Sequence, residues 1–210
     1  MDQKDSEVIK KILDYWFIPA DWDRHSRTSP EASKRHFFGG QEVDQYIINN
    51  FSHLFDQIKN KQLEHWKKDH FGRLAYIITC DQFSRNAFRE SAKQYDFDQY
   101  ALDLSDEITA NQEMYNAYKF YERQFIILPY MHSENLQHHH KCLELSEQVS
   151  LEAEKQNLPD VAKAFKQMVQ FGKSHMEAIL KFGRYPSRNK VLGRESTQEE
   201  IDYMNNGGKW

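Results

Sequence analysis

The sequence predicts an all-α protein in which residues 1–210 form a single domain. Apolar residues recur at three- and four-residue spacing along most of the chain, which is the period of an amphipathic helix. No segment alternates apolar and polar residues for long enough to build a β-sheet. The predicted helices fall into pairs of roughly 20 to 35 residues, a length that is typical of stacked antiparallel helix hairpins.

The N-terminal half is expected to hold a series of amphipathic helices that proline and glycine separate. Ser6 is the expected cap of the first helix, and Asp96 or Asp98 is the expected cap of the helix that ends this half of the chain. In this half the expected helices cover residues 6–16, 31–38, 41–58, 61–69, 72–88 and 98–108.

In the C-terminal half, one helix is expected to stop near Pro129 and another to begin around Ser133. The last long helix should start at Pro159 and end before Gly183, because proline suits the first helical position and glycine the position after the end. A basic loop at 183–194 follows. It leads to a short closing helix with two alternative capping boxes, Ser196 with Glu199 or Thr197 with Glu200.

The composition excludes several classes of protein. A net charge of -4 gives no overall field that would attract nucleic acid or an anionic membrane. The apolar runs are too short for a membrane span, and the N-terminus lacks the pattern of a signal peptide, so a cytoplasmic protein is expected. Cys80 and Cys142 have no CxxC spacing, and P-loop, GxGxxG and GxSxG motifs are absent.

Four blocks of sequence carry a resemblance to a known family. They are ILDYWF at 12–17, DQFSRNAFR at 81–89, LPYMHSEN at 128–135 and FGRYPSRNKVLGRESTQEE at 182–200. Together they resemble the bacterial domain-of-unknown-function family 924. The resemblance implies a tetratricopeptide-repeat-like fold and points to the polar residues of these blocks, but it implies no reaction.

The second block ends a helix whose apolar stripe becomes polar. Leu74 and Ile77 are followed one turn later by Asp81, then by Arg85 and Asn86. Asp81 and Arg85 are four residues apart and share a helix face, so they form an ion pair or line a pocket. Because the stripe is apolar before them, we expect this pair to be at least partly buried.

The third block places His132 and Glu134 at an expected helix start. There Ser133 would cap the helix and Glu134 would favour its dipole, while His132 beside a carboxylate is a candidate acid–base group. The run His138–His140 cannot converge on one metal ion, because consecutive helical side chains point about 100° apart. His175 lies on the apolar face of the last long helix, as a core histidine or as a second acid–base candidate.

The fourth block holds Arg184, Arg188, Asn189 and Arg194 on an irregular backbone. Arginine's planar fork suits a carboxylate or a phosphate. The loop is therefore either an anion site or a structural latch, in which Arg184 and Arg188 bind carboxylates and helix-end carbonyls.

These observations predict one polar pocket and three alternative functions. The first is binding of a small anionic ligand, and the second is a hydrolase or lyase on an acidic metabolite. The third is a repeat-like adaptor that binds a peptide. No metal, cofactor or nucleic acid is expected, and the catalytic candidates are His132, Glu134, His175 and Asp81. The predicted ligand-binding residues are Asp81, Arg85, Asn86, His132, Glu134, His175, Arg184, Arg188, Asn189 and Arg194.

Overall fold

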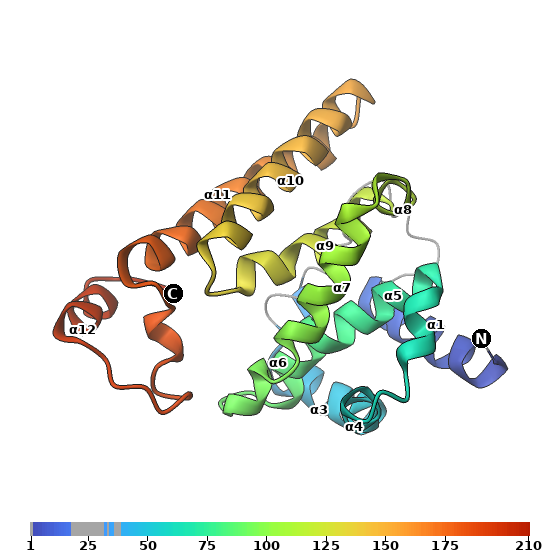
Figure 1. Cartoon of the computed structure of the whole chain (residues 1–210), viewed down its shortest axis with the longest axis horizontal. Coiled ribbons are helices and arrows are strands. Elements are labelled where there is room, and N and C mark those ends of the chain that lie inside the picture. Colours follow the sequence, from blue (N-terminus) through green and yellow to red (C-terminus); the bar gives the residue numbers. More distant parts are fainter. Residues whose placement is uncertain (1, 18–31, 33, 36–38) are drawn as a thin grey trace. The chain divides into compact units, whose positions relative to one another are not determined.

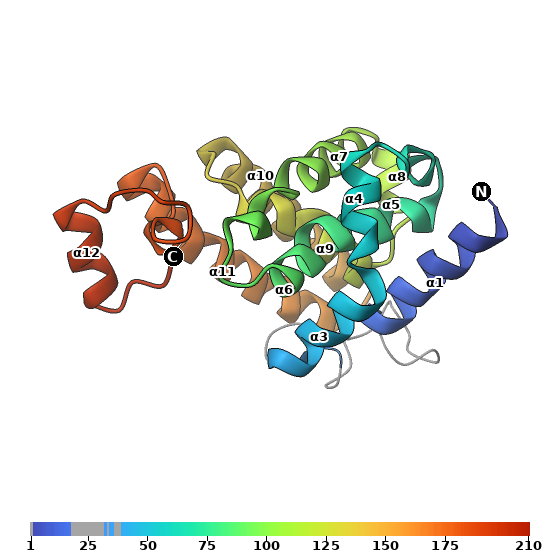
Figure 2. The same cartoon turned by 90° about the horizontal axis from the view of Figure 1, so that it is seen from below.

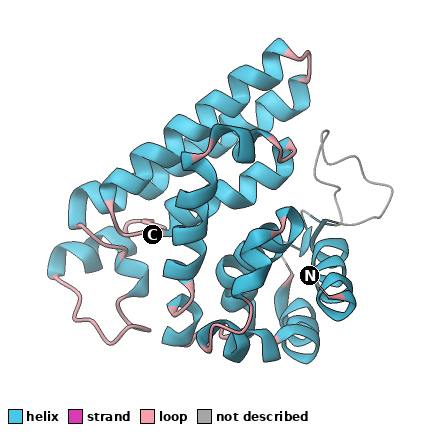
Figure 3. Ribbon diagram, turned by 45° about the vertical axis from the view of Figure 1, so that its right-hand side comes forward, coloured by secondary structure: helices cyan, strands magenta, loops and turns pink. Residues whose placement is uncertain are grey.

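The computed structural model describes residues 2–17, 32, 34–35 and 39–210, and this part of the chain contains helices and loops but no strand (Figure 3). The all-α prediction is confirmed. The chain divides into two compact units. The N-terminal unit comprises Met1–Arg89 and Lys93–Ile126, and the C-terminal unit comprises Glu90–Ala92 and Ile127–Trp210. The tetratricopeptide-repeat-like stacking remains a prediction.

The described helices up to the unit boundary are mostly short. They are α1 (Gln3–Phe17), α3 (Gly40–Phe51), α4 (His53–Lys59), the 3₁₀-helix η1 (Glu64–Lys68), α5 (His70–Ile77), the π-helix η2 (Ile78–Phe83), α6 (Ser84–Ala87), the 3₁₀-helix η3 (Ala92–Tyr95), α7 (Asp98–Ala110), α8 (Gln112–Asn116) and α9 (Phe120–His132).

Three predicted boundaries in this region differ from the structure. The first helix starts before Ser6, because the Asp2 carboxylate accepts the Asp5 N–H at 2.8 Å and caps it instead. The helix predicted at 41–58 is divided at Ser52, whose backbone keeps helical angles, so the interruption lasts one residue. Asp98 is the first residue of α7 and does not cap it. Most of the helix predicted at 31–38 lies outside the described residues.

Aromatic side chains form the centre of the N-terminal unit. Phe83 stacks on Phe51 with ring centroids 4.9 Å apart and meets the edge of Trp16 at 5.4 Å. Phe125 packs edge-on against Trp16 and Phe17, at 5.7 and 5.3 Å. All five rings are at most 2% exposed. Such buried aromatic pairs fix the packing of α1, α3 and η2 against one another.

The C-terminal unit is built on a helix hairpin. In it α10 (Leu136–Lys155) and α11 (Pro159–Phe182) run side by side in opposite directions (Figure 1). Gly172 allows their close approach, since a Cβ atom there would lie 2.8 Å from Leu143 Cδ2. The 3₁₀-helix η4 (Pro186–Arg188) and α12 (Gln198–Asn205) follow, and α12 lies at the end of α11 opposite to the hairpin turn (Figures 1 and 2).

Two predictions for this half are wrong, and two are confirmed. Pro129 lies inside α9, which continues to His132 without the backbone hydrogen bond that proline cannot donate. The next helix begins at Leu136, where Asn135 caps it by accepting the Gln137 N–H at 2.9 Å. The last long helix spans Pro159–Phe182 as predicted, and of the two capping boxes the one formed by Thr197 and Glu200 is present.

Across the part of the chain that the structure describes, no helix combines the length and the apolar character that a membrane crossing requires.

Candidate functional site

The polar residues that follow the apolar stripe lie at a π-helix. Within η2, Asp81 is 1% exposed, although it is a carboxylate. Arg85 donates a two-pronged contact to Asp98 of α7 at 2.8 and 3.1 Å, and a further hydrogen bond to the Asp81 carbonyl at 2.6 Å. Its guanidinium also lies 3.4 Å from the Asp81 carboxylate. Burial lowers the pKa of Arg85, but the charges of Asp81 and Asp98 outweigh burial and raise it.

Asn86 and Arg89 contact a second carboxylate, that of Asp44 on α3. The Asn86 amide donates to Asp44 at 2.8 Å, and Arg89 donates two hydrogen bonds to it at 2.6 and 2.7 Å. Burial raises the pKa of Asp44, but these donors outweigh burial and lower it. The polar residues of the second block thus connect α6 to α3 and to α7. Asp44, Asp98 and Arg89 were absent from the predicted site.

The end of α9 exposes carbonyl groups that the helix itself cannot pair. Tyr185 donates its hydroxyl to the Met131 carbonyl at 2.6 Å, and Arg188 donates to the His132 carbonyl at 2.7 Å. His139 Nε2 donates to the Ser133 carbonyl at 2.8 Å. Residues of the fourth sequence block and of α10 therefore supply the hydrogen-bond donors for the carbonyl groups at the end of α9.

Glu134 is the acceptor for two segments of the loop. Arg194 donates to both of its carboxylate oxygens, at 2.7 and 2.9 Å, and the Tyr185 N–H donates at 2.8 Å. Burial raises the pKa of Glu134, but Arg194 and Tyr185 outweigh burial and lower it. The predicted capping role of Ser133 is wrong, since its hydroxyl lies 2.8 Å from His138 Nδ1 and accepts the Asn135 N–H instead.

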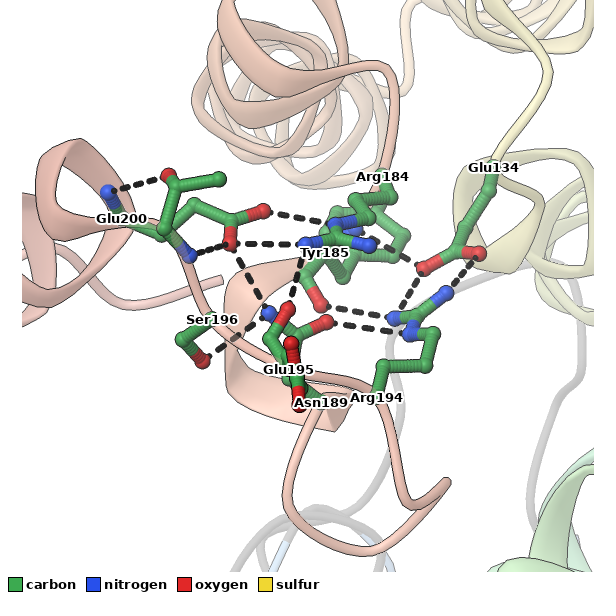
Figure 4. Close-up of polar contacts among 9 residues, drawn as sticks. Glu134, Arg184, Tyr185, Asn189, Arg194, Glu195, Ser196 and Glu200 are labelled. Carbon is green, nitrogen blue, oxygen red and sulfur yellow. Dashed lines mark hydrogen bonds and ion pairs between the residues drawn. The ribbon is translucent and has the colours of Figure 1, made fainter.

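A second carboxylate, Glu200, holds the other end of the loop. Arg184 donates to both of its oxygens at 2.6 and 2.8 Å, and Asn189 donates at 3.1 Å (Figure 4). Asn189 in turn accepts from Arg194 Nε at 3.0 Å, which joins the two carboxylates in one network. Glu200 is 2% exposed, and its pKa falls to about 2, chiefly because Arg184 donates to it. We call this network of Glu134, Arg184, Tyr185, Arg188, Asn189, Arg194 and Glu200 the latch.

The buried histidines beside the latch are poor proton carriers at neutral pH. His175 donates Nδ1–H to the Phe171 carbonyl at 2.8 Å and stacks on Trp210 at 3.6 Å. Burial, together with His132, His139 and Arg188, lowers its pKa to about 3. His139 is fully buried and its Nδ1 has no hydrogen-bond partner among the described residues, and burial lowers its pKa as well. Burial thus favours the neutral form of both rings, and the pKa of His175 is far from the value that suits an acid–base catalyst at neutral pH.

An open hollow of about 470 Å³ lies between α11, α12 and the C-terminal segment. Three carboxylates and two ammonium groups line it, so its lining has a net charge of about -1 by formal count. The hollow is lined by Ser174, Glu177, Lys181, Glu199, Asp202, Tyr203, Asn206, Gly207, Gly208 and Lys209. Phe171, one helical turn before Ser174 on α11, is 61% exposed. The described residues contain no group of three or more His, Cys, Asp or Glu residues placed to hold a metal ion.

The predicted site residues fall into both units. Asp81, Arg85 and Asn86 lie in the N-terminal unit, and the remaining predicted residues lie in the C-terminal unit. Among the latter, the three arginines, Glu134 and Asn189 join the latch. Tyr185 and Glu200 were missed, although both lie inside the fourth sequence block and Glu200 belongs to the predicted capping box.

Comparisons with known proteins agree with this arrangement of helices. A protein of unknown function from Agrobacterium tumefaciens, ATU0120, has a solved structure that matches with a TM-score of 0.77 at 23% identity. The match covers 96% of this chain and 99% of that one, and it shows a shared fold. No curated protein matches the chain. The model of the bacterial protein family of unknown function DUF924 matches residues 12–208, so the chain belongs to the DUF924 family.

Proposed function

We propose that the C-terminal unit binds a peptide segment of another protein, in the hollow between α11 and α12. The observation that carries this proposal is the open, mixed-charge hollow with the exposed ring of Phe171 one turn away. The peptide would place an apolar side chain on Phe171 and a basic side chain in the hollow, where the carboxylates of Glu177, Glu199 and Asp202 outnumber the two ammonium groups.

The internal pairing of the arginines supports a peptide over a small anion. The forks of Arg184 and Arg194 each hold a carboxylate of the same chain, so an anion would have to displace Glu200 or Glu134. The hollow itself repels an anion weakly by its net charge. Binding of a small anion therefore becomes the second candidate.

The enzyme alternative receives less support from the geometry. His175 stays neutral at neutral pH, Glu134 is held by Arg194 and Tyr185, and Asp81 is buried beside Arg85. Of the four catalytic candidates, only His132 is left without such an argument against it. A hydrolase or lyase would need a base that titrates closer to neutral pH.

A library of random peptides displayed on phage, selected against the full chain, tests the proposal. Selected peptides should contain a basic residue near an apolar one, and their affinity is measured by fluorescence anisotropy. Phe171→Ala should weaken binding by about tenfold, the usual effect of losing an exposed aromatic anchor. Glu177→Lys should weaken it through charge repulsion. Phe71→Ala is the matched control, because Phe71 is also exposed, at 47%, but lies in the N-terminal unit.

The outcomes separate the two candidates. If no peptide is selected, and if phosphate or citrate raises the melting temperature above a chloride control of equal ionic strength, the anion site replaces the peptide site. The same result with Phe171→Ala and Phe71→Ala would also exclude the hollow as the place of peptide binding.

A further inference from the structure

The middle stretches of the two long helices of the C-terminal unit carry opposite charges. From residue 142 to 154, α10 contains four glutamates and no lysine or arginine. From residue 161 to 176, α11 contains three lysines and no acidic residue. Neither the core of the hairpin nor the latch requires this separation, because these charged side chains are exposed or partly exposed and none belongs to the latch.

Part of these charges lies on one exposed face of the hairpin. Glu144, Glu147 and Leu151 follow one another at helical spacing on α10, and all three are exposed. Lys166, Lys173 and Leu180 do the same on α11, at intervals of seven residues. Lys166 forms an ion pair of 2.5 Å with Glu154 of α10, and both side chains are solvent-exposed. This pair crosses from one helix to the other, so the acidic and basic rows belong to the same face.

Two large apolar side chains lie within this charged face. Leu151 is 56% exposed and Leu180 is 59% exposed, in contrast to the buried apolar residues on the opposite side of both helices. Exposed leucines that occur singly need no explanation. Here the two leucines lie beside an acidic row and a basic row. A second copy of this face can therefore match it, acidic row on basic row.

We propose that this face binds the same face of a second copy of the chain. A twofold axis parallel to the helices would place α10 of one copy over α11 of the other, so that each acidic row meets a basic row. A twofold axis perpendicular to the helices would place α10 on α10 and α11 on α11, with like charges opposed. The charge pattern therefore selects the first arrangement and disfavours the second.

The register of the hairpin identifies the residues that would meet. Ser150 donates to the Ala162 carbonyl at 3.1 Å, and Gly172 lies beside Leu143, so the level of Glu144 on α10 falls within one turn of Lys173 on α11. In the proposed arrangement, Glu144 therefore lies within reach of Lys173 of the second copy. This proposal does not depend on the peptide site, because none of the residues of the acidic and basic rows lines the hollow.

The size of the face predicts a weak dimer. A 20-residue helix is about 30 Å long, and two adjacent helices are about 20 Å wide, so the face offers roughly 600 Å² per copy. Stable interfaces usually bury about 800 Å² per partner. Because much of the attraction is between exposed charges, the dimer should dissociate as salt is added.

Sedimentation velocity of the full chain over a range of concentrations tests the proposal. The wild type should form a reversible dimer at low chloride concentration and should be a monomer at high chloride concentration. Glu144→Lys and Lys173→Glu should each weaken the dimer by about tenfold or more, because each opposes like charges. The double variant carrying both changes should restore it. Glu113→Lys, an exposed change of the same kind on α8, is the control and should leave the dimer intact.

Either of two results would overturn the proposal. One is a wild type that stays monomeric at every concentration at low salt. The other is a dimer that the double variant fails to restore, since the restored pairing is specific to the arrangement with α10 over α11.

Discussion

Arg85 in the N-terminal unit and Arg194 in the C-terminal unit both grip a carboxylate with two hydrogen bonds, but they stabilise different kinds of structure. Arg85 binds Asp98, 13 residues away, and reaches the nearly fully buried Asp81 from within packed helices. Arg194 binds Glu134, 60 residues away, from an irregular loop. Arg85 places its charge beside the buried Asp81 carboxylate, although the Arg85 and Asp98 side chains are themselves 21% and 26% exposed. The contact between Arg194 and Glu134 orders a loop that has little core of its own. Removing this contact should therefore destabilise mainly the loop.

The largest expected effect is the loss of Arg85. Arg85→Met removes the guanidinium that lies 3.4 Å from the buried Asp81 carboxylate, which should lower the free energy of unfolding by about 3 to 5 kcal/mol. Arg89→Met is the matched control from the same block. Its side chain is 53% exposed, so the loss should stay below about 1 kcal/mol. Urea unfolding followed by circular dichroism measures both losses, and equal losses would contradict the role of Arg85 beside a buried carboxylate.

The next largest effect is the loss of stability that acid should cause through His175 of the C-terminal unit. The folded pKa of His175, about 3, is below its ordinary value of 6.5, so the unfolded chain takes up the proton first as the pH falls. Stability should therefore decrease from about pH 6.5 downwards, by on the order of 2 to 3 kcal/mol at about pH 4.5. Glu200 adds a further loss below its ordinary pKa of 4.5, because its folded pKa is about 2.

A phenylalanine at position 175 would keep the stacking on Trp210 without a titrating ring. In thermal unfolding at a series of pH values, His175→Phe should lose much less stability between about pH 6.5 and 4.5 than the wild type does. His140→Phe, at an exposed position of α10, should leave the wild-type profile unchanged. An unaltered profile in His175→Phe would show that other groups cause the acid sensitivity.

A smaller and local effect is expected in the latch. Glu134→Gln keeps the shape of the side chain but removes the charge that Arg194 binds. Both side chains are partly exposed, at 28% and 24%, so we expect a loss of about 1 to 2 kcal/mol. Hydrogen exchange should accelerate at backbone amides of residues 183–195 and stay unchanged in α5. Exchange that accelerates equally in both units would remove the distinction between them.

The smallest effect separates the latch from an anion site. Arg188→Lys loses the fork that caps the His132 carbonyl, which should cost about 1 kcal/mol. The latch predicts that phosphate and citrate stabilise neither this variant nor the wild type beyond a chloride control in a melting experiment. Anion-specific stabilisation of the wild type that Arg188→Lys abolishes would instead support a clamp.

Local signals in the sequence predict the local features of this fold. Pro159 and Gly183 mark both ends of α11, and Thr197 with Glu200 marks the start of α12, because each signal acts within one turn. The continuation of α9 through Pro129 was missed, because proline in a sequence ordinarily indicates that a helix ends.

The partners of the charged residues could not be predicted in the same way. The sequence shows where charged residues are concentrated, but the pairing of Glu134 with Arg194 spans 60 residues. Spacing in the sequence predicts pairs only within a helix, as for Asp81 and Arg85. Nothing in the spacing distinguishes an arginine that holds a carboxylate of its own chain from one that awaits a ligand.

The π-helix η2 changes the direction in which the side chains of α6 point. A π-helical turn closes its hydrogen bond five residues on, one more than an α-helical turn, so it inserts a residue into the winding of the helix. Everything after it is rotated by about 100° from the phase that α5 would otherwise continue. Arg85 reaches α7 and Asn86 reaches α3 in this rotated phase. A helical wheel drawn through both segments is therefore out of register by one residue, and that offset turns the polar block toward its two carboxylates.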